Sequence, residues 1–516
     1  MQDLMTHPLG DTQSKALIPV ADPVAVETFG GRIHVEWNPQ AAVTPLGQLP
    51  FFIDYLHVSG LFESWVSHCP LHWTSPNAPN KIDVLGTVLL SVLSGHQRYA
   101  HINALRGDGV NPGLLGMNKV VSEDSVRRGF GKMDEPEGVT WLQDSLHHVY
   151  APLLSEPWIL DVDATVKTLY GQQEGAEVGY NPHKPGRPSH TYHTYMIANL
   201  RLILEVDVQS GKQVASKYSS PGLWELLKRL PREHWPALIR GDRDWGTEAN
   251  MRQAEQAGMP YLFKLRLTKG TRTLIERLMR GRDWIDAGQG WQGAESTVRL
   301  SGWSRARRVI VLRRQVKKDV AIMSQNQAGP KQISFAELSD DVTVYEYSVL
   351  ITSLDHEIRS IAQLYRDRSD AENNFDELKK HWGWGGFTTQ DLKRCRFMAR
   401  ATALIYNWWS LFVRLADPDQ HTEAVTSRPL MLYAIGKQTR HAGQHRLTIS
   451  STHAEADKVE QRYRRIATFF KALRTTAEQL TSVQRWCRIL SLALVKYLKG
   501  RQLQPPNCLP APASLS

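Results

Sequence analysis

The sequence predicts an α/β protein in which a mixed β-sheet core is interrupted by a β-rich insertion and flanked by helical regions. At 516 residues, 41% of them hydrophobic, the chain can form several domains around a large core. Strand-like and helix-like segments alternate in its middle, whereas both ends have helical periodicity. The predicted regions are a mostly helical N-terminal region (1–155), the first part of the core (156–268), the insertion (269–342), the final strand and helix of the core (343–390) and a helical C-terminal region (391–516).

The N-terminal region is predicted to be mostly helical after an extended start. The segment VLGTVLLSVLSGHQ has the composition of a buried helix that ends at a glycine. In SEDSVRRGF, Ser122 is suited to cap a helix that carries two arginines one turn later. Both a helix-turn-helix-like DNA-binding region and a purely structural helical domain fit this pattern.

The first strand of the core is predicted at WILDVDATV, where polar and apolar residues alternate. Asp161 and Asp163 lie on the same face of this strand. The next segments, YMIANLRLILEVDV, the turn SGK and QVASKYS, predict a hairpin, and GLWELLKRL predicts a helix.

A second strand with an acidic end follows this helix. ALIRGD predicts a short buried strand that ends at Asp242, and TEANMRQAEQAG predicts a helix capped by Thr247 with Gly258 just past its end. YLFKLRLT is the next strand. The order of three strands, helix, strand, helix, strand and a last helix is that of a ribonuclease H-like domain.

The insertion and the C-terminal region are rich in aromatic residues. Short β-like runs such as RVIVLRRQV extend from Thr268 to Val342, with tryptophans among the turns. Trp291 or Trp303 could stack on a base flipped out near a cleavage site, and packing within the insertion is the alternative. The helical C-terminal region offers apolar surface for dimerisation or, equally, intrachain core, through Trp408, Trp409, Phe412 and Phe470.

The last helix of the core carries a row of polar residues. Tyr365, Arg368, Glu372 and Lys379 are spaced so that one continuous helix places them within about 60° of arc. The neighbouring stripe is apolar, which predicts that the row lies at the edge of a core. An ordinary surface pair between Arg368 and Glu372, worth about 0.3–0.5 kcal/mol, is the simpler alternative.

Three carboxylates are expected to meet at one edge of such a sheet. They are Asp163, which we favour over Asp161, Asp242, which precedes Asp244 in the loop, and Glu372. Hard oxygen ligands of this kind suit two Mg²⁺ or Mn²⁺ ions. Two such ions can activate an attacking hydroxyl and stabilise a leaving oxygen, so the predicted chemistry is phosphodiester cleavage or transfer.

The charge of the chain suggests a polyanionic partner. The net charge is +10 and the pI about 9.3. Residues 299–318 contain eight Lys or Arg and no acid, and residues 453–501 contain eleven against four acids. Nucleic acid fits these clusters, and a solvated protein surface fits each of them as well.

No feature of the sequence predicts secretion or a membrane. The four cysteines are scattered without a C-x-x-C pair, as in proteins of a thiol-reducing compartment. The N-terminus lacks a basic segment followed by an apolar run, and no apolar stretch approaches 18 residues. We therefore expect a cytoplasmic protein.

The row on the last helix resembles the signature of a known family. Tyr365-x2-Arg368-x3-Glu372-x6-Lys379 matches the Y-R-E-K pattern of the DDE transposases of bacterial insertion sequences, in the branch with a β-rich insertion before the final Glu. LDVDATVKTLYGQQEGAEVGYNPHKPGRPSH and LIRGDRDWG also resemble this family's segments around the first and second Asp. The resemblance covers roughly residues 80 to 410.

The resemblance implies roles for these residues. Asp163, Asp242 and Glu372 would bind the metal ions, and Tyr365, Arg368 and Lys379 would contact phosphates of the transposon end. The chain departs from the family at Asp163, since relatives commonly have Ser or Gly before the Thr and this sequence has Ala164.

The implied function is a cut-and-paste transposase in the bacterial cytosol or nucleoid. Its helical N-terminal region would bind the terminal inverted repeats of double-stranded DNA. The enzyme would cleave there with Mg²⁺ and join the 3′-OH ends to target DNA, as a homodimer on DNA. A structure-specific nuclease on the same core and a repurposed, non-catalytic DNA-binding protein are the alternatives.

A basic loop is expected near the carboxylates. The segment HKPGRPSH contains Lys184 and Arg187 between His183 and His190. We expect Lys184 and Arg187 to contact the DNA backbone, with a solvated loop as the alternative. The two histidines lack the spacing of zinc ligands.

Overall fold

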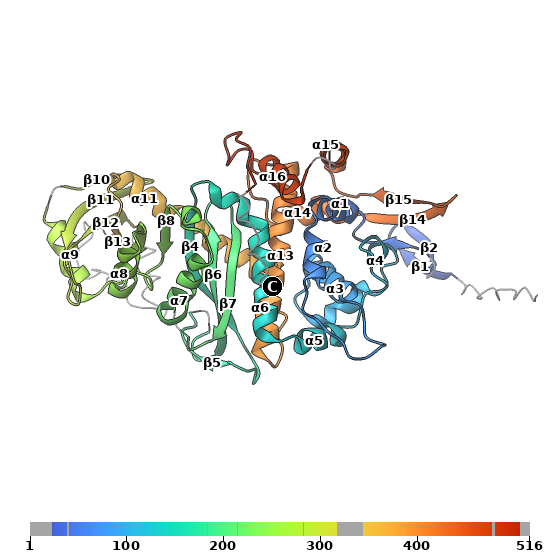
Figure 1. Ribbon diagram of the computed structural model, residues 1–516, viewed down its shortest axis with the longest axis horizontal. Coiled ribbons are helices and arrows are strands. Elements are labelled where there is room, and N and C mark those ends of the chain that lie inside the picture. Colours follow the sequence, from blue (N-terminus) through green and yellow to red (C-terminus); the bar gives the residue numbers. More distant parts are fainter. Residues whose placement is uncertain are drawn as a thin grey trace, which may run out of the picture.

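The computed structural model describes residues 23–38, 41–182, 184–213, 215–281, 283–316, 344–476 and 480–505. The molecule is elongated, with one large mixed sheet towards one end and a group of helices towards the other (Figure 1). Two β-hairpins lie beyond the helices, at the end of the molecule opposite the strands β10–β13 (Figure 1).

The strands of the predicted core form the first half of the sheet. In spatial order they are β7 (Leu202–Ser210), β6 (Pro188–Ile197), β4 (Ile159–Thr168), β8 (Leu238–Gly241) and β9 (Tyr261–Lys264). β6 is antiparallel to both β7 and β4, whereas β4, β8 and β9 run parallel to one another. A two-residue strand, β5 (Glu177–Val178), pairs with the start of β6.

The strands of the predicted insertion continue this sheet and do not form a separate β subdomain. β13 (Tyr345–Thr352), the predicted final strand of the core, pairs antiparallel with β9 and provides partners for the backbone groups at the outer edge of β9. Three more antiparallel strands follow: β12 (Arg307–Gln315), β11 (Trp291–Val298) and β10 (Ile285–Gly288). The predicted insertion begins with a helix, α9 (Lys269–Met279), and residues 317–342 of it lie outside the described chain.

The predicted hairpin around SGK is wrong, and a different hairpin forms from β6 and β7 within YMIANLRLILEVDV. The chain reverses between Ile197 and Leu202, where Asn199 and Arg201 have φ values of 66° and 55°. Asparagine tolerates this left-handed conformation better than most residues. The segment QVASKYS is therefore not a strand, and a helix, α7 (Ala215–Lys228), begins within it and packs on β4 and β6.

Two predicted helix caps are confirmed. The Ser122 hydroxyl accepts a hydrogen bond from the backbone N–H of Ser125 and begins α5 (Glu123–Lys132). Thr247 caps α8 (Glu248–Gln256) in the same way. In α5, Arg127 and Arg128 pair with acids of the same helix, which reduces the charge that suggested DNA binding.

The long helix α13 (Leu392–Ala416) connects the sheet with the N-terminal helices. It packs on β7 and on α6 (Glu135–Tyr150), and nearly all of its side chains are buried. The aromatic residues proposed as a dimerisation surface belong to this intrachain core: Trp408, Trp409, Phe412 and Phe470. They provide no exposed apolar patch for a partner.

The remaining elements surround α13. On the N-terminal side they are α1 (Leu49–Ser59), α2 (Leu61–Ser67), α3 (Lys81–Leu93), α4 (Asn111–Leu114) and the 3₁₀-helices Tyr99–Leu105 and Ala151–Ser155. A further 3₁₀-helix, Arg232–His234, precedes β8 and contacts Ala151–Ser155. On the C-terminal side they are α14 (Ala424–Met431), α15 (Ala456–Thr475) and α16 (Ser482–Ala493). α3 is the predicted apolar helix, and it is buried over almost its whole length.

Two hairpins complete the fold. One is β1 (Val24–Thr28) with β2 (Gly31–Val35), and the other is β14 (Ile435–His441) with β15 (Gln444–Ser450). The short strand β3 (Val43–Thr44) pairs with β14. Cys69, Cys395 and Cys487 are free thiols in the core, and Cys508 lies outside the described residues. Among the described helices, none has the length and apolar character needed to cross a bilayer.

Candidate functional site

Parallel pairing of β4 with β8 brings two aspartates together. Val162 of β4 lies opposite Gly241 of β8, and the next residue on each strand is Asp163 or Asp242. β4 is paired on both sides, which fixes the direction in which its side chains point. The local alternation of the sequence and the register of one strand pair therefore place both carboxylates at the same point of the sheet.

The predicted single helix through residues 365–379 is two helices with a tight joint. α11 (Ile358–Arg366) carries Tyr365, and α12 (Ser369–His381) carries Glu372 in its first turn and Lys379 in its last. At the joint, the N–H of Arg368 donates to the carbonyl of Tyr365 at 3.2 Å, a 3₁₀-type bond. Asp and Ser on either side of Arg368 favour caps and turns over helix interiors, which explains the break.

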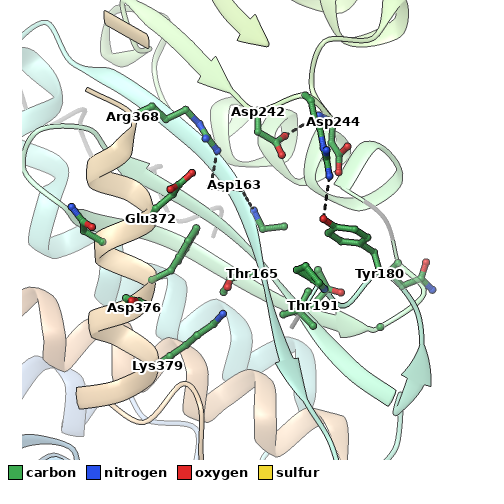
Figure 2. Close-up of a pocket in the computed structure, with 18 residues that line it drawn as sticks. Asp163, Thr165, Tyr180, Thr191, Asp242, Asp244, Arg368, Glu372, Asp376 and Lys379 are labelled. Atoms are coloured by element: carbon green, nitrogen blue, oxygen red, sulfur yellow. Dashed lines mark hydrogen bonds and ion pairs between the residues drawn. The ribbon is translucent and has the colours of Figure 1, made fainter. Parts of the chain in front are cut away.

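Asp163, Asp242 and Glu372 line one pocket of about 540 Å³ (Figure 2). Two further carboxylates, Asp244 and Asp376, line it as well. Asp376 was missing from the sequence-based set, although its position one helical turn after Glu372 was the signal that it shares that face. The pocket also contains three cationic side chains: Arg243, Arg368 and Lys379.

A buried ion pair joins Arg368 to Asp163 inside the pocket. Nη2 of Arg368 lies 2.5 Å from Oδ2 of Asp163, and the other carboxylate oxygen accepts a hydrogen bond from the N–H of Ala164 at 2.8 Å. The Arg368 side chain is only 7% exposed. Its Nε has no hydrogen-bond partner among the described residues, so this guanidinium has donor capacity left for another anion.

The electrostatics of the pocket are those of crowded carboxylates. The pKa of Asp163 is raised to about 6, mainly by burial and also by Asp242 and Glu372, while Arg368 opposes the rise. Burial also raises the pKa of Asp242. Burial acts to lower the pKa of Arg368, but Asp163, Tyr365 and Asp242 together outweigh it and the net direction is upward. The pocket thus carries negative charge that an additional cation would neutralise.

The donor set fits a hard divalent cation. Carboxylate oxygens are the side-chain ligands that Mg²⁺ and Mn²⁺ prefer. In the arrangement described, no group of three His, Cys, Asp or Glu side chains among the described residues is close enough to hold one ion. Arg368 is the cation in contact with Asp163.

Asp161 lies beneath the pocket in a separate ion pair. Both of its carboxylate oxygens accept hydrogen bonds from Arg240, each at 2.6 Å, and both side chains are fully buried. Arg240 also donates to the backbone carbonyl of Leu364, at the end of α11. Asp161 is not among the residues lining the pocket, and its oxygens are occupied in joining β4, β8 and α11.

The predicted DNA-contact residues are divided between the pocket and its surroundings. Arg368 and Lys379 line the pocket, whereas Tyr365 does not. The pKa of Tyr365 is nevertheless raised to about 12, mainly by burial and also by the pocket carboxylates. Lys184 and Arg187 are exposed, and both lie on the ring of Tyr170 at 5.1 and 5.9 Å.

The two histidines of the predicted basic loop do not extend its charge. His190 is buried in β6, where its Nε2 donates to the carbonyl of Glu174 at 2.8 Å. Burial lowers the pKa of His190, so it is neutral near pH 7 and provides no cationic contact. His183 lies outside the described residues. Tyr180 and Pro182 of the same segment line the pocket (Figure 2).

The two tryptophans proposed for base stacking pack within the protein. Trp303 is 8% exposed, belongs to the main core and lies under Arg307 at 5.5 Å. Trp291 is half-buried beside α11, with Arg314 5.0 Å from its ring. Neither lines the pocket.

The comparisons with known proteins identify the family of the chain. The family described as "Transposase DDE domain group 1" matches residues 80–471, a range that contains all of the pocket residues. The chain belongs to this family. No curated protein sequence matches the chain. Among solved structures, the cryo-EM structure of a piggyBac transposase synaptic complex with hairpin DNA is similar at a TM-score of 0.38 and 11% identity, over 92% of this chain and 89% of that one.

Membership of the family confirms the coarse part of the sequence-based expectation. The chain is a DDE transposase, a class of DNA-transposing enzyme. Its assignment to a bacterial insertion-sequence branch, the Y-R-E-K pattern and the roles of individual residues remain predictions.

Proposed function

We propose that this transposase acts by cut-and-paste transposition, in the bacterial insertion-sequence branch of the family. It would bind the terminal inverted repeats of its element, cleave the DNA there and transfer the 3′-OH ends to target DNA. The observation that carries the proposal is the meeting of Asp163, Asp242 and Glu372 in one pocket from three separate segments. The strand order β7-β6-β4-β8-β9, with β6 alone antiparallel to β4, supports a ribonuclease H-like core.

Asp163, Asp242 and Glu372 would hold two Mg²⁺ or Mn²⁺ ions. When bound, such ions activate the attacking oxygen and stabilise the leaving oxygen of an in-line displacement. The carboxylates contribute the charge, and their burial keeps competing water away from the reacting phosphate. Asp161 has a different task in this proposal, which is to hold β4 against β8 through Arg240.

Arg368 and Lys379 would position the DNA backbone. A guanidinium can donate two hydrogen bonds to one phosphate, and the buried Nε of Arg368 has no hydrogen-bond partner among the described residues. Lys379 supplies a point charge. Burial lowers its pKa because it disfavours the charged form, and a phosphate beside Lys379 would stabilise that charge. Tyr365 would donate from its neutral hydroxyl.

Lys184 and Arg187 would follow the same DNA strand outside the pocket. Their loop also contributes Tyr180 and Pro182 to the pocket wall, so a duplex that leaves the pocket on that side meets both cations. Transposition needs two ends held together, so we also propose a homodimer on DNA. A cytoplasmic location is consistent with the three free, buried cysteines.

A strand-transfer assay tests the proposal against its alternatives. The parent protein is incubated with Mg²⁺, a labelled element end and a supercoiled target plasmid. Cleavage together with joining of the label to the plasmid is the expected result. Cleavage without joining would identify a structure-specific nuclease, and binding without either reaction would identify a repurposed DNA-binding protein.

A further inference from the structure

The hairpin β14–β15 projects from the helical end of the molecule (Figure 1). Its two strands are joined by Ala442 and Gly443, whose φ values of 48° and 78° are those of a tight two-residue turn. At its base, β14 pairs with the two residues of β3. The rest of the hairpin extends into solvent, with both strands exposed over most of their length.

Beyond Ile435 and Ser450 at its base, one face of this hairpin consists of hydrogen-bond donors. Alternation along the strands and the pairing register place six exposed side chains on it: Lys437, Thr439, His441, Gln444, Arg446 and Thr448. We call this the donor face. Its cations alternate with hydroxyl and amide groups, since Lys437 lies opposite Thr448 and Thr439 opposite Arg446. On the opposite face, Gly436 is buried and Gln438 and Leu447 are half-buried.

The cations of the hairpin are not neutralised. The sequence has no Asp or Glu between Glu423 and Glu455. Among the described residues, no acid lies within ion-pair distance of Lys437, Arg440 or Arg446, whereas other exposed cations, such as Lys458, Arg464 and Arg474, pair with acids. Positive charge without an acidic partner among the described residues raises the local potential for an anionic partner.

We propose that the donor face binds the sugar–phosphate backbone of duplex DNA, as a contact separate from the catalytic pocket. This inference rests on the proposed function. Lys, Arg, Thr and Gln side chains make most phosphate and sugar contacts in protein–DNA complexes, and a two-stranded β-ribbon fits the major groove. The hairpin lies beyond the helices, away from the pocket, so it would contact DNA at a distance from the cleaved bond (Figure 1).

A second copy of the chain is the less suitable occupant. Protein interfaces have an apolar centre with few charges, whereas the apolar side chain on this face of the hairpin, Ile435, lies at its base and the centre of the face is polar and basic. Two copies of this face would also repel each other. The other exposed hairpin has the opposite character, because β1–β2 presents Val24, Val26 and Ile33 with only one pair of opposite charges, Arg32 and Glu27.

The hairpin offers its own matched control. Arg446 lies on the donor face, and Arg440 lies on the opposite face of the same hairpin, equally exposed and equally charged. Arg446→Ala, Arg440→Ala and the double variant Lys437→Ala/Arg446→Ala are compared with the parent. Binding of a fluorescent duplex of about 40 base pairs and arbitrary sequence is measured by anisotropy between about 50 and 200 mM salt, because phosphate contacts do not depend on sequence.

We expect the slope of log Kd against log salt concentration to fall by about one in Arg446→Ala and by about two in the double variant. Arg440→Ala should keep the slope of the parent. Arg446→Lys should restore the parental slope, which separates lost charge from a misfolded hairpin. Equal slopes for Arg446→Ala and Arg440→Ala would overturn the proposal. A change in the sedimentation of the DNA-free protein would overturn it in favour of a second copy. If the parent binds as expected but never cleaves, only the proposed function fails.

Discussion

Strand β12 and the hairpin β14–β15 both carry several basic residues, but their cations have different neighbours in the fold. On β12, Arg307 is only 2% exposed and pairs with Glu248 at 2.6 Å and Glu255 at 2.7 Å. Two further arginines of β12 pair with acids of the neighbouring strands, as Arg308–Glu295 and Arg314–Glu346. On the hairpin β14–β15, no described acid lies near any of the cations.

The difference shows that a basic run in sequence is not a basic surface in space. Every acid that neutralises β12 lies outside residues 299–318 and is brought there by α8, β11 or β13. The hairpin has no such neighbour, because it packs against the rest of the chain only near its base. A cation that lacks an acidic partner in the fold is therefore a better indicator of a polyanion-binding surface than a high density of basic residues in the sequence.

The largest effect should come from the pocket, where acids outnumber cations. Glu372→Gln removes one charge and keeps the shape of α12, so we expect cleavage to fall by at least about 10³-fold, or about 4 kcal/mol of barrier. DNA binding should change little. Asp370→Asn is the matched control, since Asp370 lies in the same helical turn and pairs with Arg201 outside the pocket. Cleavage by Glu372→Gln within about tenfold of the parent would refute the metal-binding assignment.

The two aspartates of β4 extend this test. Asp163→Asn and Asp242→Asn should lose cleavage as Glu372→Gln does. Asp161→Asn should retain more activity and lose stability instead, because it leaves the buried Arg240 without its charged partner. The reverse pattern would exchange the roles of Asp161 and Asp163.

The paired arginines of β12 should contribute to the stability of the protein and not to DNA binding. Arg307→Ala removes the buried cation that Glu248 and Glu255 share, and we expect the free energy of unfolding to fall by about 2–4 kcal/mol in urea titrations. The salt dependence of DNA binding should stay parental. Arg305→Ala is the control, because Arg305 is mostly exposed while pairing with the same Glu255. A reduced salt slope in a stable Arg307→Ala protein would show that β12 also binds DNA.

A smaller effect is expected on the pH dependence of stability. The pKa of Asp163 is raised to about 6 in the folded protein, against about 3.9 in an unfolded chain. Between these values the folded state holds a proton that the unfolded state has lost, so this group lowers stability as pH rises from about 4 to about 6, by about 1–3 kcal/mol. Denaturation of the metal-free protein should show a flatter profile for Asp163→Asn. Parallel profiles for variant and parent would contradict the assignment.

The smallest effect should be on DNA contacts inside the pocket. Arg368→Ala and Lys379→Ala should each weaken binding to a cleaved end and reduce the salt slope by about one. Lys380→Ala serves as the control, since Lys380 pairs with Asp376 at 2.7 Å and does not line the pocket. If neither slope changes, Arg368 and Lys379 serve only the structure of the protein.

Much of the sheet and of the candidate site could be predicted because the signals are local. Alternation in WILDVDATV predicts the strand that carries Asp163, the buried run before Asp242 predicts the strand that this residue follows, and Thr247 predicts the start of α8. The break between α11 and α12 escaped prediction, because the α-helix and the 3₁₀-helix differ by one residue in hydrogen-bond spacing and the polar pattern fits both.

Features that depend on distant partners could not be predicted. The burial of His190 and Trp303 is decided by strands and helices far along the chain. The pairing of Arg368 with Asp163 joins residues more than 200 positions apart, and composition does not reveal it. The hairpin β14–β15 was not predicted for the same reason, because its exposure depends on the absence of other segments packed against it.

The burial of α13 has a consequence for synthesis of the chain. This helix fills the space between β7 and the helices α3, α5 and α6, all of which precede it by more than 180 residues. Until Ala416 has left the ribosome, those earlier segments expose the apolar faces that α13 later covers. A fragment that ends before Leu392 should therefore aggregate when expressed alone, and the nascent protein depends on late, long-range closure to complete its core.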